Sequence, residues 1–346
     1  MVKAVTTVNG LVEAGLAQPE QRAALEKVST EFSIRLTPHV LAQIETATMA
    51  DPIFAQYVPR VGELEHHPSE ISDPIGDHAY QPVKGVTHRY PDRVLLKPTH
   101  ICQVYCRFCF RREKVGKAEE ALDDAELDAA LHYISKRPEI WEVVLSGGDP
   151  LVLSNRRLAQ ILNRLAAIEH VAVVRFHTRV PVVDPARIDA EFVATLEIRP
   201  AVYVVVHVNH AAELTPEVLQ AFALMVEGGI PLLAQTVLLR GVNDSVEALV
   251  KLMRGLVAAR VKPYYIHHLD KAKGTSHFRV PIKQGQELMR QLRGRISGLC
   301  QPTYVLDIPG GFGKVPIGPQ YLSEPAGDQY EVLDYRGGSH DYVDKS

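Results

Sequence analysis

The sequence predicts an α/β fold in which a parallel sheet curls into a partial (β/α) barrel. From about residue 92, about seven short apolar runs alternate with stretches that have helical periodicity. The runs are apolar on both faces, which is typical of parallel strands covered by helices. Polar and glycine-rich residues follow several runs directly, at the strand ends where barrel enzymes carry their chemistry. The candidate functional residues are therefore expected along one edge of the sheet.

The individual elements follow from the hydrophobic periodicity and from the turn residues between the runs. Residues 1–85 are expected to form an N-terminal helical segment and linker, with helices over 19–28 and 37–46 and a polar loop over 64–81. Residues 86–314 form the predicted barrel, and 315–346 a C-terminal extension. Strands are expected over 93–97, 143–145, 171–176, 202–208, 232–239, 264–267 and 304–308. Helices are expected over 122–135, 156–168, 186–196, 216–227, 246–258 and 284–299.

Composition narrows the class of protein. The 346 residues are 46% hydrophobic and 23% charged, the balance of a folded globular chain. The formal net charge of −3 does not indicate a nucleic-acid partner. No apolar stretch approaches the roughly 20 residues of a membrane span, and the first residues lack a secretion signal. These features predict a cytoplasmic protein that works away from membranes.

Three of the four cysteines lie within eight residues, as Cys102, Cys106 and Cys109. Clustered thiols in a large chain indicate a metal site rather than a disulfide framework. Three thiolates can hold three irons of a [4Fe–4S] cluster, which leaves the fourth iron open for S-adenosylmethionine (SAM). Two alternatives remain. The spacing also fits three buried thiols on one helix face, although Arg107 and Arg111 would be poor neighbours there. Zinc would require a second ligand pair, which is not evident.

The thiol spacing, together with the Phe-Arg-Arg run at 110–112, resembles the radical SAM superfamily. The Gly-Gly-Asp-Pro run at 147–150 is similar to the glycine-rich motif of that superfamily, whose backbone meets the amino group of SAM. The resemblance implies a radical SAM barrel in which Gly147, Gly148 and Asp149 bind SAM.

From about residue 73 to 342 the chain resembles the lysine 2,3-aminomutase family, on the stretches 87–93, 145–150, 235–244, 263–265, 277–279 and 307–314. The resemblance implies that Lys314, after a glycine-rich turn, forms a Schiff base with pyridoxal 5′-phosphate (PLP). It also implies that Arg89, Tyr90 and Arg93 bind PLP, since an Arg fork suits its phosphate and an aromatic ring its pyridine.

Two positions depart from the family pattern. Phe312 stands where the family more often has glycine, and His267 stands where a tyrosine near the cofactor is expected. Some contacts to PLP should therefore differ in this chain.

The resemblance also implies the substrate contacts. Arg111 corresponds to the residue that holds the substrate carboxylate, and Asp270 and Asp307 to the two acids that receive the distal amino group of lysine. Two carboxylates facing one ammonium make a selective site. The implied activity is an isomerase that converts lysine to β-lysine. Arginine and ornithine remain alternative substrates, because they are also cationic.

Among weaker candidates, His210 is expected to reach a cofactor, and His177, Arg179 and Asn209 also lie at strand ends. The resemblance further implies an electron donor such as flavodoxin or ferredoxin, and a homo-oligomer. A different class of protein, a non-catalytic iron–sulfur carrier, would need a fourth thiolate near the cluster and no lysine site for PLP.

Overall fold

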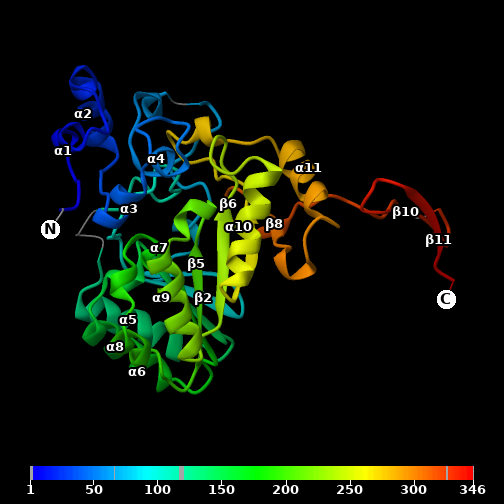
Figure 1. Ribbon diagram of the computed structural model, residues 1–346. Coiled ribbons are helices and arrows are strands. Elements are labelled where there is room, and N and C mark those ends of the chain that lie inside the picture. The colour runs from blue at the N-terminus through cyan, green and yellow to red at the C-terminus, as the bar shows by residue number, and fades with distance from the viewer. Residues whose placement is uncertain (1–2, 66, 117–120, 325, 346) are drawn as a thin grey trace.

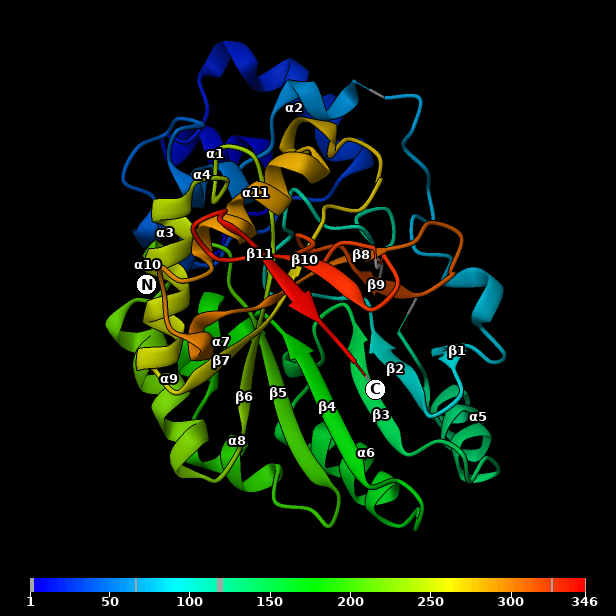
Figure 2. The same cartoon turned by 90° about the vertical axis from the view of Figure 1, so that its right-hand side faces the viewer.

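The computed structural model describes residues 3–65, 67–116, 121–324 and 326–345. A nine-stranded sheet in the order β1 to β9 forms its centre and is curled (Figure 2). The strands are β1 (Val86–Tyr90), β2 (Arg93–Thr99), β3 (Glu142–Gly147), β4 (Val173–Thr178), β5 (Ala201–His207), β6 (Leu232–Val237), β7 (Val261–His267), β8 (Thr303–Asp307) and β9 (Lys314–Pro316).

The strands β2 to β8 run parallel, and β1 and β9 pair antiparallel at the two edges. The partial parallel barrel predicted from the sequence is thus confirmed. The two edge strands were not predicted. A strand of three residues that begins with a lysine carries too little hydrophobic periodicity to be recognised.

Eleven α-helices are assigned in the described part of the chain. Four precede the sheet: α1 (Val8–Glu13), α2 (Arg22–Glu31), α3 (Pro38–Gln43) and α4 (Pro52–Tyr57). The others are α5 (Asp124–Ser135), α6 (Asn155–Ala166), α7 (Val180–Val183), α8 (Ala190–Thr195), α9 (Pro216–Glu227), α10 (Val246–Ala258) and α11 (Ile282–Leu292). Figures 1 and 2 show α5, α6, α8, α9 and α10 along one side of the sheet.

Helix boundaries were predicted less well than helix positions. The prediction for α9 and α10 is confirmed to the residue. The helix expected over 284–299 ends at Leu292, because Gly294 adopts φ +74°, a left-handed conformation that cannot continue a helix. The helix expected over 186–196 is shortened at its start by a 3₁₀ turn at Pro185.

The sheet buries one face and leaves the other partly open. Along β6, Leu232, Ala234 and Thr236 are buried, and the residues between them are only partly buried. This alternation is what a strand shows when its outer face packs on helices and its inner face lines an interior. Alternate residues of β6 therefore face the helices and the inner side of the sheet.

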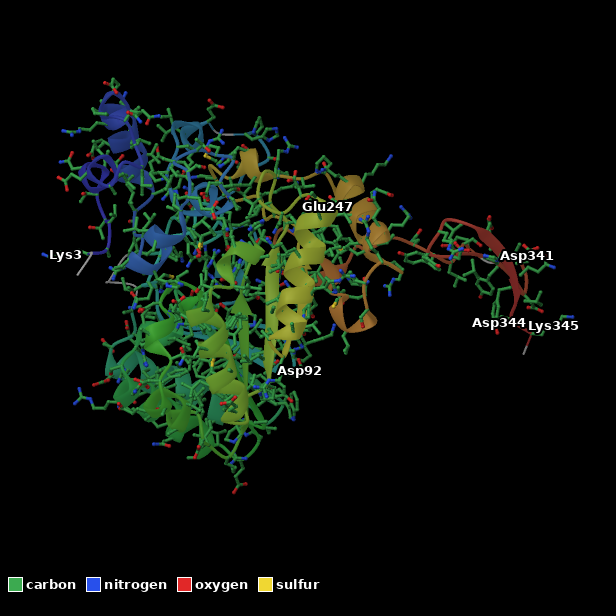
Figure 3. All side chains as sticks on the ribbon, in the orientation of Figure 1. Lys3, Asp92, Glu247, Asp341, Asp344 and Lys345 are labelled. Atoms are coloured by element: carbon green, nitrogen blue, oxygen red, sulfur yellow. The ribbon has the colours of Figure 1, made fainter. Side chains whose placement is uncertain are left out.

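The C-terminal segment leaves this body. Strands β10 (Gln329–Leu333) and β11 (Ser339–Val343) form a separate antiparallel hairpin that projects away from the sheet (Figure 1). Figure 3 shows Asp341, Asp344 and Lys345 at its far end. No helix within the described residues has the length and apolar character needed to cross a membrane.

Candidate active site

The catalytic lysine predicted from the sequence lies where three neighbouring strands meet. Lys314 opens β9 and pairs in register with Asp307, the last residue of β8. His267 is the last residue of β7, which runs beside β8. Because parallel strands end at the same edge of a sheet, this register brings the three side chains together at that edge.

Lys314 is held by two partners at this edge. Its Nζ forms an ion pair with the Asp307 carboxylate and lies 3.3 Å from Nδ1 of His267. The Nδ1 of His267 is also 3.5 Å from Asp307. Burial alone would raise the pKa of Asp307, but hydrogen bonding to His267 and the charge of Lys314 bring this pKa far below its ordinary value. Asp307 is thus ionised throughout the physiological range.

Asp270, the second predicted acid, follows β7 and faces the same space. It makes no hydrogen bond or ion pair with any described residue. Burial, and next the negative charge of Asp307, raise the pKa of Asp270 to about 7. Lys314 and Arg111 act in the opposite direction. The two carboxylates therefore repel each other, and Asp270 can gain or lose its proton near neutral pH.

Arg111 is paired with an acid that the sequence did not reveal as a site residue. Its Nε and one terminal nitrogen lie 3.0 and 2.7 Å from Oδ2 of Asp77. Arg89 reaches the other oxygen of Asp77 at 3.2 Å, and Lys97 lies 3.7 Å away. Three cations thus surround one buried carboxylate. Despite burial, Arg111 and then Lys97 lower the pKa of Asp77 to about 2.

Asp77 belongs to the segment predicted as a polar loop. That segment packs on the turn before Lys314, since a Cβ at Gly76 would lie 2.6 Å from the Gly310 carbonyl carbon. Lys97 carried a signal that was available in the sequence: a charged residue within an otherwise apolar strand needs a buried partner. Its pKa is lowered to about 8, mainly by burial and then by Arg111.

The other two predicted PLP contacts lie on the β1–β2 edge. The Tyr90 hydroxyl accepts a hydrogen bond of 2.8 Å from the Lys314 backbone N–H. The Arg93 guanidinium stacks 3.9 Å from the centre of the Tyr90 ring. The ring centre of Tyr265 lies 5.7 Å from Nζ of Lys314, and Arg175 forms an ion pair with Glu142 at 2.7 Å. Arg175 was not predicted from the sequence.

The thiol loop lies at the same end of the sheet, after β2. Cys102, Cys106 and Cys109 are all half-buried free thiols. Burial raises the pKa of each thiol, for Cys109 to about 11. The Arg179 guanidinium donates a 3.0 Å hydrogen bond to Sγ of Cys106. A cationic neighbour of this kind favours a thiolate once a metal displaces the proton.

The three thiols do not converge on one point. Within the described ranges no three His, Cys, Asp or Glu side chains gather closely enough for a single metal ion. An iron–sulfur cluster does not need such convergence, because each thiolate binds a different iron. The fourth cysteine, Cys300, is buried beyond α11. Cys102, Cys106 and Cys109 therefore stay the predicted ligands of an iron–sulfur cluster.

The glycine-rich turn after β3 presses against the thiol loop. The Gly148 N–H donates to the Thr99 carbonyl at 2.7 Å, and a Cβ on Gly148 would lie 2.3 Å from the Ile101 carbonyl oxygen. Gly147 adopts φ +109°, which side chains other than glycine rarely allow. Asp149 is buried and accepts bonds from Thr178 and from the Arg179 backbone. These residues hold the two loops together. Nothing in the structure tests whether they also contact SAM, which stays a prediction.

A buried charge cluster ties the thiol loop to the N-terminal segment. Glu63 is fully buried and forms ion pairs with Arg107 and Arg112, which flank Cys109. Arg107 donates further to the Ser33 carbonyl at 2.9 Å. Glu63 was missed because it lies between the helix expected over 37–46 and the polar loop expected over 64–81, where no element was predicted.

His210 lies apart from the lysine site. Its Nδ1 accepts a 3.2 Å hydrogen bond from the Ala212 N–H, at the start of a short 3₁₀ helix. Burial lowers its pKa, and its nearest charges are Glu213, Lys251 and Asp51. The predicted cofactor role of His210 stays a prediction. His177, a weaker candidate, is buried near Lys314 and His267.

Two protein families match this chain. Residues 96–253 match the radical SAM superfamily, which spans β2 to α10 and includes the thiol loop. Residues 289–344 match the family described as Lysine-2,3-aminomutase, which includes Asp307, Lys314 and the hairpin.

Full-length relatives extend the match over the N-terminal segment. The L-lysine 2,3-aminomutase of Acetoanaerobium sticklandii is 42% identical over 318 residues, covering 92% of this chain and 77% of the relative. The L-lysine 2,3-aminomutase of Fusobacterium nucleatum is 39% identical over 322 residues, covering 93% and 76%. The glutamate 2,3-aminomutase of Clostridioides difficile is 35% identical over 333 residues, covering 96% and 79%.

Proposed function

Because the chain belongs to the lysine 2,3-aminomutase family of radical SAM enzymes, we propose that it moves the 2-amino group of L-lysine to carbon 3 and so forms β-lysine. The placement of Lys314 beside Asp307, with Asp270 facing both, carries this proposal. Family membership favours an isomerase over an iron–sulfur carrier. The names of the relatives favour lysine over arginine and ornithine.

The residues present fit the cofactors of such an enzyme. Membership of the radical SAM superfamily implies SAM and a [4Fe–4S] cluster, for which Cys102, Cys106 and Cys109 are the proposed ligands. Lys314 and Tyr90 are proposed to hold PLP, with its phosphate toward Arg93. When bound, the cluster and SAM supply a carbon radical, and PLP supplies the conjugated system through which the nitrogen migrates.

The chain's own residues orient the substrate. Arg111 is proposed to bind the substrate carboxylate, since its guanidinium already forms a two-nitrogen contact with an internal carboxylate. Asp307 and Asp270 are proposed to receive the distal ammonium. Their mutual repulsion is relieved when a cation arrives between them. An anionic side chain such as that of glutamate would add a third negative charge at this place and is disfavoured.

Two features are proposed to limit side reactions. The loops that carry the thiols and Asp77 lie at the same end of the sheet as Lys314, and we propose that they limit the access of water to a bound radical. Arg179 and Asp149 fix the thiol loop against β4, which keeps the radical source at a constant position. An electron donor of the flavodoxin or ferredoxin class and a homo-oligomeric assembly are part of the proposal.

The proposal is tested with the full chain under anaerobic conditions. The cluster is reconstituted, PLP, SAM, a reductant and one amino acid are added, and the product is identified by mass spectrometry. L-Lysine should give β-lysine, with L-arginine, L-ornithine and L-glutamate as comparison substrates. The Lys314→Ala variant should give no product, and the exposed Lys283→Ala variant should match the wild type.

Two results would contradict the assignment. Product from arginine or ornithine, with none from lysine, would replace the substrate and keep the cofactors. Product from Lys314→Ala at the wild-type rate would remove the lysine from the chemistry.

A further inference from the structure

We propose that His267 exchanges a proton with the Lys314 amine when a carbonyl group is attached to that amine and released from it. The inference rests on the proposed function, because it assigns a role to a residue beside the proposed PLP lysine. The family resemblance predicts a tyrosine at position 267, so it does not account for the histidine found here.

The geometry supplies a direct path for the proton. Nδ1 of His267 lies 3.3 Å from Nζ of Lys314, within hydrogen-bonding distance, and 3.5 Å from Asp307. All three residues come from adjacent strands whose register is set by backbone pairing. The arrangement therefore does not depend on a mobile loop.

Charge balance favours one shared proton. Asp307 provides one negative charge for two basic nitrogens, those of Lys314 and His267. Burial and then the charge of Lys314 lower the pKa of His267, and Asp307 acts in the opposite direction. When Lys314 gives up its charge, one of the two depressing influences disappears and the Asp307 carboxylate remains. The imidazole can then carry the positive charge that the lysine has lost.

The second ring nitrogen explains why His267 rests in the neutral form. Nε2 is buried and has no hydrogen-bond partner among the residues that the structure describes. Because Nδ1 is the nitrogen that accepts the proton, Nε2 carries a hydrogen in both forms of the ring. This unpartnered donor costs more in the charged ring than in the neutral one, which favours the neutral form at rest.

Other titratable groups around His267 do not compete for this role. The groups that face it or act on it are Asp307 from β8, Lys314 from β9, Tyr265 from β7, His177 from β4 and His207 from β5. Both neighbouring histidines have pKa values lowered mainly by burial. Of these groups, Asp307 pairs with the Lys314 amine, and the centre of the Tyr265 ring lies 5.7 Å from it. Burial raises the pKa of Tyr265 well above its ordinary value, so its hydroxyl keeps its proton.

The chemical step balances as a proton transfer followed by condensation. The Lys314 ammonium gives one proton to Nδ1 of His267 and becomes a neutral nucleophile. The amine nitrogen then bonds to the aldehyde carbon of PLP, and the aldehyde oxygen leaves as water with the two remaining nitrogen protons. On release, an incoming amine takes over the carbon. The imidazolium returns its proton to the departing Lys314 amine.

The chain offers a matched control one residue away. His268 follows His267 but points to the opposite face, where its Nδ1 lies 2.8 Å from the Tyr304 hydroxyl. Both histidines are partly buried, so the same substitution at either position perturbs packing to a similar degree. Only His267 contacts Lys314.

The test measures capture of PLP at Lys314, without lysine or SAM. Full-length protein with its cluster is mixed with PLP, quenched with borohydride at set times, and the modified Lys314 peptide is quantified by mass spectrometry. Rates are compared from about pH 6.5 to about pH 10 for the wild type, His267→Gln, His267→Tyr and His268→Gln. PLP affinity is measured in parallel from equilibrium binding.

The proposal expects a pH-dependent defect. At about pH 7, His267→Gln should capture PLP roughly a hundredfold more slowly than the wild type, the usual scale of acid–base assistance. The difference should shrink as the pH approaches the ordinary lysine pKa of about 10.4. His267→Tyr should recover part of the rate near pH 10, and His268→Gln should follow the wild type throughout.

Each other outcome is decisive. If His267→Gln retains the wild-type pH profile, or slows equally at all pH values with weaker PLP binding, the histidine only shapes the pocket and the proposal is overturned. If the wild type itself captures no PLP at Lys314, the proposed function loses its cofactor, and this inference is overturned with it.

Discussion

The charges around the thiol loop and the charges around Lys314 are balanced in different ways. At the thiol loop, Glu63 is enclosed by two guanidinium groups and Asp149 accepts from a hydroxyl and from backbone N–H groups. At the lysine site, formed by Lys314, Asp307, His267 and Asp270, Asp270 has no partner among the described residues, and Lys314 shares Asp307 with His267.

This difference separates a region whose charges stabilise the structure from a region whose charges can bind a ligand. A buried charge with fixed partners is costly to disturb, so it positions the loop that carries the proposed cluster ligands. A charged group that has no partner, or that shares its partner with another group, can bind a ligand without first losing an existing hydrogen bond or ion pair. Mutations near the thiol loop should therefore lower stability, and mutations at the lysine site should weaken ligand binding.

The largest expected effect is on stability, at Glu63. In Glu63→Gln the two arginines lose their buried counter-charge, which should lower the free energy of unfolding by about 3–5 kcal/mol. Glu65→Gln, at an exposed position two residues on, should change it by less than about 0.5 kcal/mol. Chemical denaturation followed by circular dichroism measures both. Equal stability of the two variants would remove the distinction between the regions.

A loss of binding is expected next, at Asp307. In Asp307→Asn, both Lys314 and the substrate ammonium lose their carboxylate, so kcat/KM for lysine should fall roughly a hundredfold or more. The free energy of unfolding should change far less than in Glu63→Gln. Steady-state kinetics and chemical denaturation of the same preparation measure the two effects. An Asp307→Asn protein that is unfolded would contradict the expectation that this residue acts on binding rather than on stability.

A pH effect of about tenfold is expected at Asp270. Burial and then Asp307 raise the pKa of Asp270 to about 7, so this carboxyl is increasingly protonated below that pH. KM for lysine should therefore rise by up to about tenfold over the pH unit below the pKa, while Asp307 stays ionised. In Asp270→Asn the KM should be high and nearly independent of pH. A flat KM profile in the wild type would contradict the assignment.

The smallest effect is expected at Phe312, the second departure from the family pattern. Its side chain is 76% exposed, so it contributes little packing. Phe312→Gly should change kcat/KM by less than about threefold and the unfolding free energy by about 0.5–1 kcal/mol, through added chain flexibility. Kinetics and thermal denaturation measure the two values. A loss of PLP binding would show that the ring shapes the turn before Lys314.

The sequence predicted the sheet well because its strands have a strong local signal. The runs at β3, β5 and β6 are apolar and bounded by turn residues, and α9 and α10 carry clear helical periodicity. The strands β1 and β9 lack that signal, because each lies at an end of the sheet, pairs along one edge only, and is partly exposed. Their positions depend on pairing with distant strands.

The site was predicted in part for a similar reason. Motif residues such as Lys314 and Asp307 could be matched to a pattern, and the structure brings them together with Arg111 and Asp270. Asp77 and Glu63 could not be found in this way. Their importance comes from cations supplied by other segments, 34 and 44 residues away in the chain.

The ion pairs of Asp77 have a further consequence for selectivity among ligands. A carboxylate tethered to the protein is present at a high effective concentration next to Arg111, so a free carboxylate must outcompete it. Acetate or a simple fatty acid offers nothing beyond the contact it displaces and should be a poor competitor. Under the proposed function, an amino acid would add a covalent bond to PLP and an ion pair with Asp307 and Asp270, and these extra contacts would decide which molecules the site retains.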